Sequence, residues 1–317
     1  MDTPGKVVRR GERTWSEGAA PEPFGRRYAW KTSSLSRGQG LRRLGAHLEQ
    51  ILPGKASCQL HFHLREEEHF VVLAGELTVR EQWPGTEGVV EYSAKAGDLL
   101  VYLPGTGVAH QFRNDGPTEV SVLAASRSAP GDVCVYPETA RVLMAELRRN
   151  IRLDDASVAR LRGDARTSRP VEPLVRGLRA PHGHRQAIEF GAAWPGRGLR
   201  VVAAELAPGG STEPSEPSSS IEELLWVRSG ELIVREHVGG EVVDTVLRDG
   251  DVISWSGGAR PAYELLNGGS SSVDYVAVTE KPHAEADEHD DFSQIPQWLI
   301  EAPGDNVSPW EGVQLGG

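Results

Sequence analysis

The chain has 317 residues, enough for two domains of ordinary size, and a formal net charge of −11. Hydrophobic residues make up 38% and charged residues 25%, as in folded globular proteins. The negative charge would repel a phosphate backbone, so we expect no binding to nucleic acid. No stretch approaches the length of a membrane span and Met1–Arg10 has no signal-peptide core, so we expect no membrane attachment and a cytoplasmic location.

Short apolar and β-branched runs, each bounded by turn residues, predict β-strands in both halves of the chain. The runs cover Glu68–Leu73, Leu99–Leu103, Val120–Ala124, Leu224–Val227, Val252–Trp255 and Val273–Val278. The 36 glycines and 21 prolines suit many tight turns between such strands. The expected fold class is therefore mainly all-β.

One group of residues in the first half has the composition of a metal site. His61 and His63 are two residues apart, so on a strand both side chains point to one face. Glu68 follows a short turn and can return on the adjacent strand, and His110 comes from a distant strand. Three imidazoles and a carboxylate suit Fe(II), Mn(II), Ni(II), Cu(II) or Zn(II), whereas Ca²⁺ prefers oxygen ligands. We predict one divalent transition metal per chain.

The surrounding residues resemble the two motifs of the cupin superfamily. Gly54, His61, His63, Glu68 and Gly75 follow the first motif, with one extra residue before His61. Gly97, Pro104, Gly107, His110 and Asn114 resemble the second, with two gaps that are each one residue longer. The resemblance implies an antiparallel jelly-roll barrel over about residues 25–130, with the metal inside.

The second half repeats the first. Pro53-Gly54 recurs as Pro208-Gly209, and Leu73–Arg80 matches Arg228–Arg235. The chain is therefore expected to be a bicupin, with its second barrel over 180–282. The alignment replaces His61, His63, Glu68 and His110 by Glu216, Ser218, Glu223 and Tyr263. We predict a second barrel without a metal; a hard cation on Glu216 and Glu223 is the alternative.

The segments outside the barrels differ in pattern. Residues 131–179 are expected to form a helical connector, with an amphipathic helix over Glu138–Arg149 and further helical structure over Asp155–Leu161. His182-Gly-His184 lacks a following Glu turn and is interpreted as connector. The tail, 283–317, begins with an acidic run, Glu285–Asp291, and contains Trp298 and Trp310, which we expect to pack over a barrel or a neighbouring subunit.

Strand alternation also predicts the surroundings of the metal. Gln59 shares the parity of the two histidines and is expected to hydrogen-bond a ligand or orient a metal-bound water, or else to be a polar group at the barrel mouth. Phe70 and Phe112 would form an apolar substrate wall, or plain core. Cys58 has the opposite parity and should face away from the metal, and His69 should lie on the surface.

Four protein ligands leave one or two positions on the metal for substrate, O₂ or water. The resemblance implies reactions as diverse as dioxygenation, decarboxylation, isomerisation and elimination, and also binding proteins without activity. We predict an Fe(II)-dependent, dioxygenase-like enzyme that acts on a small organic substrate, in which Glu68 could also leave the metal and act as a base. The alternatives are a non-redox lyase, isomerase or decarboxylase, a non-catalytic binding or sensor protein, and a purely structural metal. A homodimer is expected.

Overall fold

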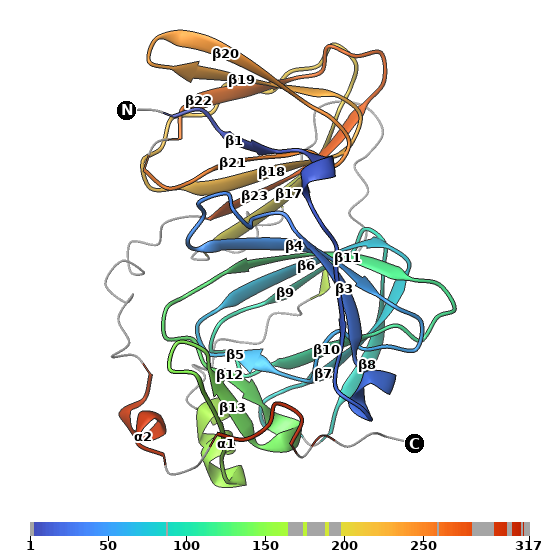
Figure 1. The fold of residues 1–317 in the computed structure, drawn as a ribbon, viewed down its shortest axis with the longest axis vertical. Helices are drawn as coiled ribbons and strands as arrows, with labels where there is room; N and C mark the ends of the chain where they lie inside the picture. Colours follow the sequence, from blue (N-terminus) through green and yellow to red (C-terminus); the bar gives the residue numbers. More distant parts are fainter. Residues whose placement is uncertain are drawn as a thin grey trace.

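Two β-barrels make up the chain in the computed structural model (Figure 1). The structure describes residues 3–86, 88–163, 174–175, 188–189, 198–258, 260–280, 295–302, 306–311 and 313. The fold is mainly β, as the sequence predicts. His182, His184 and the acidic run 285–291 lie outside the described residues.

The first barrel has a seven-stranded sheet that faces a three-stranded sheet. The larger sheet has the order β15(Leu174–Val175), β9(Leu99–Tyr102), β6(Glu67–Ala74), β11(Val120–Arg127), β4(Leu44–Ile51), β3(Ala29–Ser34), β2(Ser16–Ala19). The smaller sheet has the order β10(Ala109–Arg113), β7(Glu76–Gln82), β8(Val90–Lys95). All of these pairings are antiparallel, and apolar side chains from both sheets form the core between them.

The second barrel repeats this arrangement. Its six-stranded sheet has the order β1(Lys6–Val8), β21(Val252–Trp255), β18(Glu222–Ser229), β23(Val273–Glu280), β17(Leu199–Leu206), β16(Ile188–Glu189). The three-stranded sheet has the order β20(Glu241–Leu247), β19(Leu232–Val238), β22(Ala262–Leu266). The N-terminal strand β1 pairs with β21 and lies beside the second barrel in Figure 1, whereas β2 belongs to the first. Residues before 25 therefore join both barrels.

The connector is less helical than predicted. A four-stranded sheet, β14(Arg149–Arg152), β13(Arg141–Met144), β12(Cys134–Tyr136), β5(Phe62–His63), follows the first barrel, and the helix predicted over 138–149 is wrong. In this segment Val142 and Met144 alternate along β13, and both pack in the core cluster that contains Phe62 of β5. A spacing of two residues fits one face of a strand, not one face of a helix. Helix α1(Asp155–Gly163) confirms helical structure over 155–161.

The short elements and the tail lie against the first barrel. Single 3₁₀ turns occur at Arg10–Glu12, Phe24–Arg26 and Pro137–Thr139, and α2(Gln297–Ile300) packs beside α1. Trp310 stacks on Phe24 with ring centroids 5.5 Å apart, so the tail packs over a barrel as predicted. No helix in the described ranges is long and apolar enough to cross a membrane.

The two barrels pack sheet against sheet through a shared apolar core. Buried carboxylates reinforce it in a reciprocal way: Glu222 of the second barrel accepts backbone N–H groups of residues 42–44, and Glu67 of the first accepts the N–H of Gly198. His69 pairs with Glu67 at 2.8 Å and is only 1% exposed, so its prediction as a surface residue is wrong. It does face away from Glu68, but the second barrel covers that face.

Candidate metal centre

The predicted ligands lie close together in the first barrel. His63 lies on β5, Glu68 begins β6 and His110 lies on β10. His61 precedes β5 and forms a bridge with His110, in which each backbone N–H donates to the other residue's carbonyl oxygen, at 3.1 and 2.8 Å. This backbone pairing brings residues that are far apart in the sequence to one point.

Glu68 is the centre of the group. Its Oε2 lies 3.6 Å from His63 Nε2 and 3.3 Å from His110 Nε2. One ligand atom each of His61, Glu68 and His110 lies within 4.8 Å of the others. The rings of His61 and His110 are 4.7 Å apart, and those of His61 and His63 are 5.1 Å apart. His63 is not in this group of three but belongs to two neighbouring groups, one with His61 and Cys134 and one with Glu66 and Asp132. Three of the four predicted ligands can thus converge on one ion as they stand, and His63 lies next to them.

Hydrogen bonds behind the rings orient two of the imidazoles. His61 Nδ1 donates to the carbonyl oxygen of Gln59 at 2.9 Å, and His63 Nδ1 donates to Asp132 Oδ2 at 2.5 Å. Asp132 is itself held by the backbone N–H groups of Arg65 and Glu66. In both histidines Nε2 is thereby left to bind a metal, an arrangement typical of metal-binding histidines.

Buried polar atoms without partners show that the residues fit a metal. Glu68 Oε2 and both ring nitrogens of His110 are buried and make no hydrogen bond within the described part of the chain. An orphaned buried polar group is costly, and coordination of a divalent cation would satisfy Glu68 Oε2 and His110 Nε2, which lie 3.3 Å apart. Tyr102 stacks on His110 at 3.7 Å and fixes the plane of that ring.

The electrostatics of the group also favour a cation. Burial alone would raise the pKa of Glu68, but the imidazoles of His63, His110 and His61 outweigh it and hold the pKa well below its usual range. Burial lowers the pKa of His110 to about 4, so this imidazole is neutral and able to coordinate at neutral pH. His63 differs: burial acts to lower its pKa, but Cys134, Glu68 and Asp132 raise it well above the usual value, so a metal would have to displace a proton from this ring.

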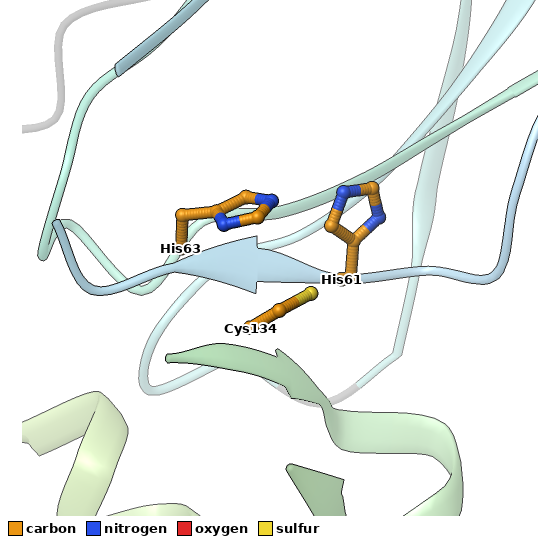
Figure 2. Close-up of side chains that lie close together, drawn as sticks. All are labelled: His61, His63 and Cys134. Carbon is orange, nitrogen blue, oxygen red and sulfur yellow. The ribbon is translucent and has the colours of Figure 1, made fainter. Parts of the chain in front are cut away.

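Two thiols lie near His61, on different sides of it. Figure 2 shows the Cys134 side chain pointing toward His61 and His63, and its sulfur belongs to a second group of three donors within 4.8 Å. Cys58 Sγ lies 3.5 Å from His61 Nδ1, the nitrogen behind the ring, and is in none of the donor groups of the described residues, so its facing away from the metal stays a prediction. Residues 57–60 are not in a regular strand, and strand parity does not apply to them.

The predicted pocket residues have different surroundings. Phe70 and Phe112 are buried, and each ring lies 5.6 Å from that of His110, so they form an apolar wall beside the ligands. The Gln59 amide instead donates to Pro309 O and accepts from Arg141, both at 2.7 Å. Its side chain ties the tail to β13, and its role toward a metal-bound ligand stays a prediction.

Strand β4 contributes two residues that the sequence analysis missed, His47 and Glu49. Glu49 is only 8% exposed and has no hydrogen-bond partner among the described residues. Burial, then the charge of Glu68, raise the pKa of Glu49 to about 7. Burial lowers the pKa of His47, although Glu68 acts to raise it. The only signal for them in the sequence is the spacing of His47, Glu49 and Ile51, which places the three side chains on one face of a strand.

The second barrel has replaced the metal site with an ion pair. Glu223, equivalent to Glu68, accepts from Tyr263 Oη at 3.0 Å and lies 3.4 Å from Arg260 Nη1. Ser215, whose N–H donates to Tyr263 O, takes the backbone position of His61, one residue before the predicted Glu216. Because Arg260 also donates to Ser215 Oγ, its guanidinium supplies a positive charge next to the buried Glu223.

Comparison with known proteins agrees with this architecture. Residues 47–126 match the family model described as cupin domain. The first barrel therefore contains a cupin domain. A point mutant of oxalate decarboxylase from Bacillus subtilis is 11% identical, with a TM-score of 0.59, over 95% of this cupin and 84% of that chain. Vicilin from Solanum lycopersicum (tomato) is 13% identical, with a TM-score of 0.53, over 86% and 84%.

A third solved structure extends the range of functions that share this fold. Procruciferin, an 11S globulin from Brassica napus, is 12% identical, with a TM-score of 0.53, over 89% of this cupin and 85% of that chain. Comparison with curated protein sequences gives no match. At these identities the solved structures establish the two-barrel cupin fold and leave the activity to be argued from the site.

Substitution Asp132→Asn should weaken metal binding by about 10- to 100-fold, because the amide no longer orients His63 as a carboxylate does. Competition between the protein and a chromophoric chelator for Mn(II) or Zn(II) measures the change. Asp115→Asn, on the exposed outer surface, is the matched control. Equal metal affinities for the two variants would show that Asp132 does not orient a metal ligand.

Substitution Arg260→Ala should destabilise the protein by about 3–5 kcal/mol, because Glu223 would remain buried without its cation. The free energy of unfolding in urea measures the loss. Arg248→Ala breaks an exposed ion pair with Glu231 and should cost less than about 1 kcal/mol. If both variants lose the same small amount, Arg260 does not neutralise Glu223.

The metal-free protein should respond to pH through Glu49. A folded pKa of about 7 against 4.5 means that the folded state binds the proton more tightly, so this stability is present below pH 4.5 and lost as pH rises through 7. Glu49→Gln should therefore be more stable than wild type by about 3 kcal/mol above pH 7, with no difference near pH 4. Thermal unfolding of both metal-free proteins across this range checks it, and a pH-independent difference would contradict it.

Proposed function

We propose that this cupin is a metal-dependent enzyme with a single active centre, in which His61, His63, Glu68 and His110 hold a divalent transition metal. The unsatisfied buried atoms of Glu68 and His110 are the observation that carries this proposal. Bound there, the metal would supply a Lewis acid with open positions for a small organic substrate. The second barrel, with Arg260 beside Glu223, serves as a structural partner.

The reaction that we propose is oxygenation of a small organic substrate with Fe(II) at this centre. Held by three imidazoles and one carboxylate, iron would supply the redox chemistry that an oxygenation needs and would keep open positions for a substrate. Phe70 and Phe112 would exclude water from one side of the bound substrate, since both are buried against His110. The carboxylate of Glu49 could accept a substrate proton as it binds.

A non-redox decarboxylase or lyase is the second candidate, and Glu49 is the observation that favours it. Loss of CO₂ leaves a carbanion that must be protonated, and a buried carboxyl whose pKa is about 7 is a suitable donor at neutral pH. Oxalate decarboxylase from Bacillus subtilis, which shares the fold, is described as having Mn(II) centres. A non-catalytic binding or sensor protein is the third possibility, since vicilin and an 11S globulin share the fold as well.

The deciding experiment combines metal analysis with oxygen uptake. Wild type and His110→Ala are loaded with Fe(II) or Mn(II), and bound metal is counted by plasma mass spectrometry. We expect about one metal per chain in wild type and its loss in the variant. Fe(II) protein is then screened with small phenols and carboxylic acids in an oxygen electrode.

Each outcome separates the candidates. Oxygen consumption that needs both iron and His110 supports the oxygenase. Product formation that continues without oxygen contradicts the oxygenase and supports the decarboxylase or lyase. Failure of the wild-type protein to bind any divalent transition metal would overturn the metal centre itself.

A further inference from the structure

The inner face of β4 adds a polar wall to the metal centre. In the sheet register His47 pairs with Ala124, which pairs in turn with Phe70, and Glu49 pairs with Val122. Directly paired residues on antiparallel strands point to the same face. Phe70, Val122 and Ala124 belong to the core inside the first barrel, so His47 and Glu49 point into it as well.

Glu68 lies on this same face, two residues before Phe70 on β6. Its register partner across β11 is Ser126, and beyond Ser126 on β4 lies Gly45. The residues between Glu68 and the β4 pair are therefore small. Glu68 acts electrostatically on both His47 and Glu49, and His61 acts on Glu49, which places the wall next to the ligands.

The wall has a distinctive charge. In the described part of the chain no lysine or arginine is among the charged groups that act on Glu49 or His47. Glu49 is more than nine-tenths buried and its carboxyl has no hydrogen-bond partner among these residues. Its oxygens are not among the fully buried atoms that lack a partner, so they border space that a small ligand can reach. A carboxyl that is largely desolvated and has no partner is unfavourable for folding, so a role toward a ligand explains its presence better than packing does.

The second barrel provides an internal comparison. Its strand β17 has the same register, with Val202 paired to Ala277 and Ala204 paired to Tyr275. Val202 thus takes the position of His47, and Ala204 that of Glu49. The barrel that lacks the histidine ligands lacks this polar pair too, and packs apolar side chains in its place. The pair accompanies the metal site and is not needed to build the barrel.

We propose that His47 and Glu49 form the substrate-selecting wall of the metal centre, and that they favour a substrate whose group facing them is a hydroxyl or an ammonium and not a second carboxylate. This inference rests on the metal centre proposed above. A hydroxyl or ammonium would donate a hydrogen bond to the Glu49 carboxylate, whereas a carboxylate at the same place would meet a like charge.

Three two-carbon acids test the selection directly, because each offers one carboxylate to the metal and differs at the other end. Oxalate carries a second carboxylate, glycolate a hydroxyl and glycine an ammonium. Their affinities for the Mn(II)-loaded protein are measured by calorimetry at pH 8, after the metal content has been counted. No turnover is needed, so the readout does not depend on the identity of the reaction.

The variants are Glu49→Gln, which keeps the shape, and Glu49→Ala and His47→Val, which introduce the residues found at the matching positions of the second barrel. Glu205→Gln changes an exposed carboxylate on β17 and is the control. Relative to wild type, Glu49→Gln should bind oxalate about tenfold more tightly and glycine about tenfold more weakly, each about 1.4 kcal/mol. Glycolate should change by less than about threefold.

The outcomes distinguish this inference from the proposed function. One metal per chain with the same order of affinities in wild type and Glu49→Gln would overturn the selecting wall and leave the metal centre intact. Loss of the metal in Glu49→Gln would also overturn it, since Glu49 would then support the ligands. If wild type binds no metal, the proposed function fails and the wall fails with it.

Discussion

A buried glutamate at the start of one strand in each barrel is the constraint around which this cupin is organised. Glu68 and Glu223 occupy equivalent register positions, and both are removed from water. An ionised carboxylate in such a place requires a positive partner or a dense set of donors. The first barrel surrounds Glu68 with three imidazoles, and the second places Arg260 and Tyr263 against Glu223.

These two solutions have different consequences. An arginine is charged at every relevant pH and fills the space next to the carboxylate, so the second barrel is closed to a ligand at that point. Imidazoles are neutral at neutral pH when burial lowers their pKa, as it does for His110, and they leave donor atoms pointing at a common centre. The exchange of the imidazole partners for an arginine and a tyrosine thus separates the second barrel from one with the donor set for a metal.

The sequence predicted the ligands better than their surroundings. Motif spacing selected His61, His63, Glu68 and His110, and the structure brings these side chains close together because their positions follow from strand period and turn length. Strand parity does not apply to Gln59, since residues 57–60 are irregular, and its amide is engaged with Arg141 and Pro309. Asp132 could not be predicted, because its contact with His63 depends on the path of the chain after the barrel.

The missed residues also show where single-strand patterns lose information. His69 was placed on the surface because it faces away from Glu68, but a pattern of alternation does not say what covers the other face. The second barrel covers it. Likewise the apolar residues over 138–149 fit a helix and a strand, and pairing with β12 and β14 decides for the strand.

The second barrel therefore contributes to the metal centre without touching the metal. Strand β6 carries Glu68 on its inner face, and on its outer face His69 pairs with Glu67, which accepts the N–H of Gly198 from the second barrel. Arg127, on the neighbouring strand β11, forms an ion pair with Glu280 across the same interface. Because the backbone of β6 is held from behind at the residues on either side of Glu68, the carboxylate keeps its position although its own Oε2 has no hydrogen bond. A central ligand that makes no hydrogen bond in the metal-free protein needs a backbone that is fixed by other contacts. The packing of one barrel on the other provides these contacts.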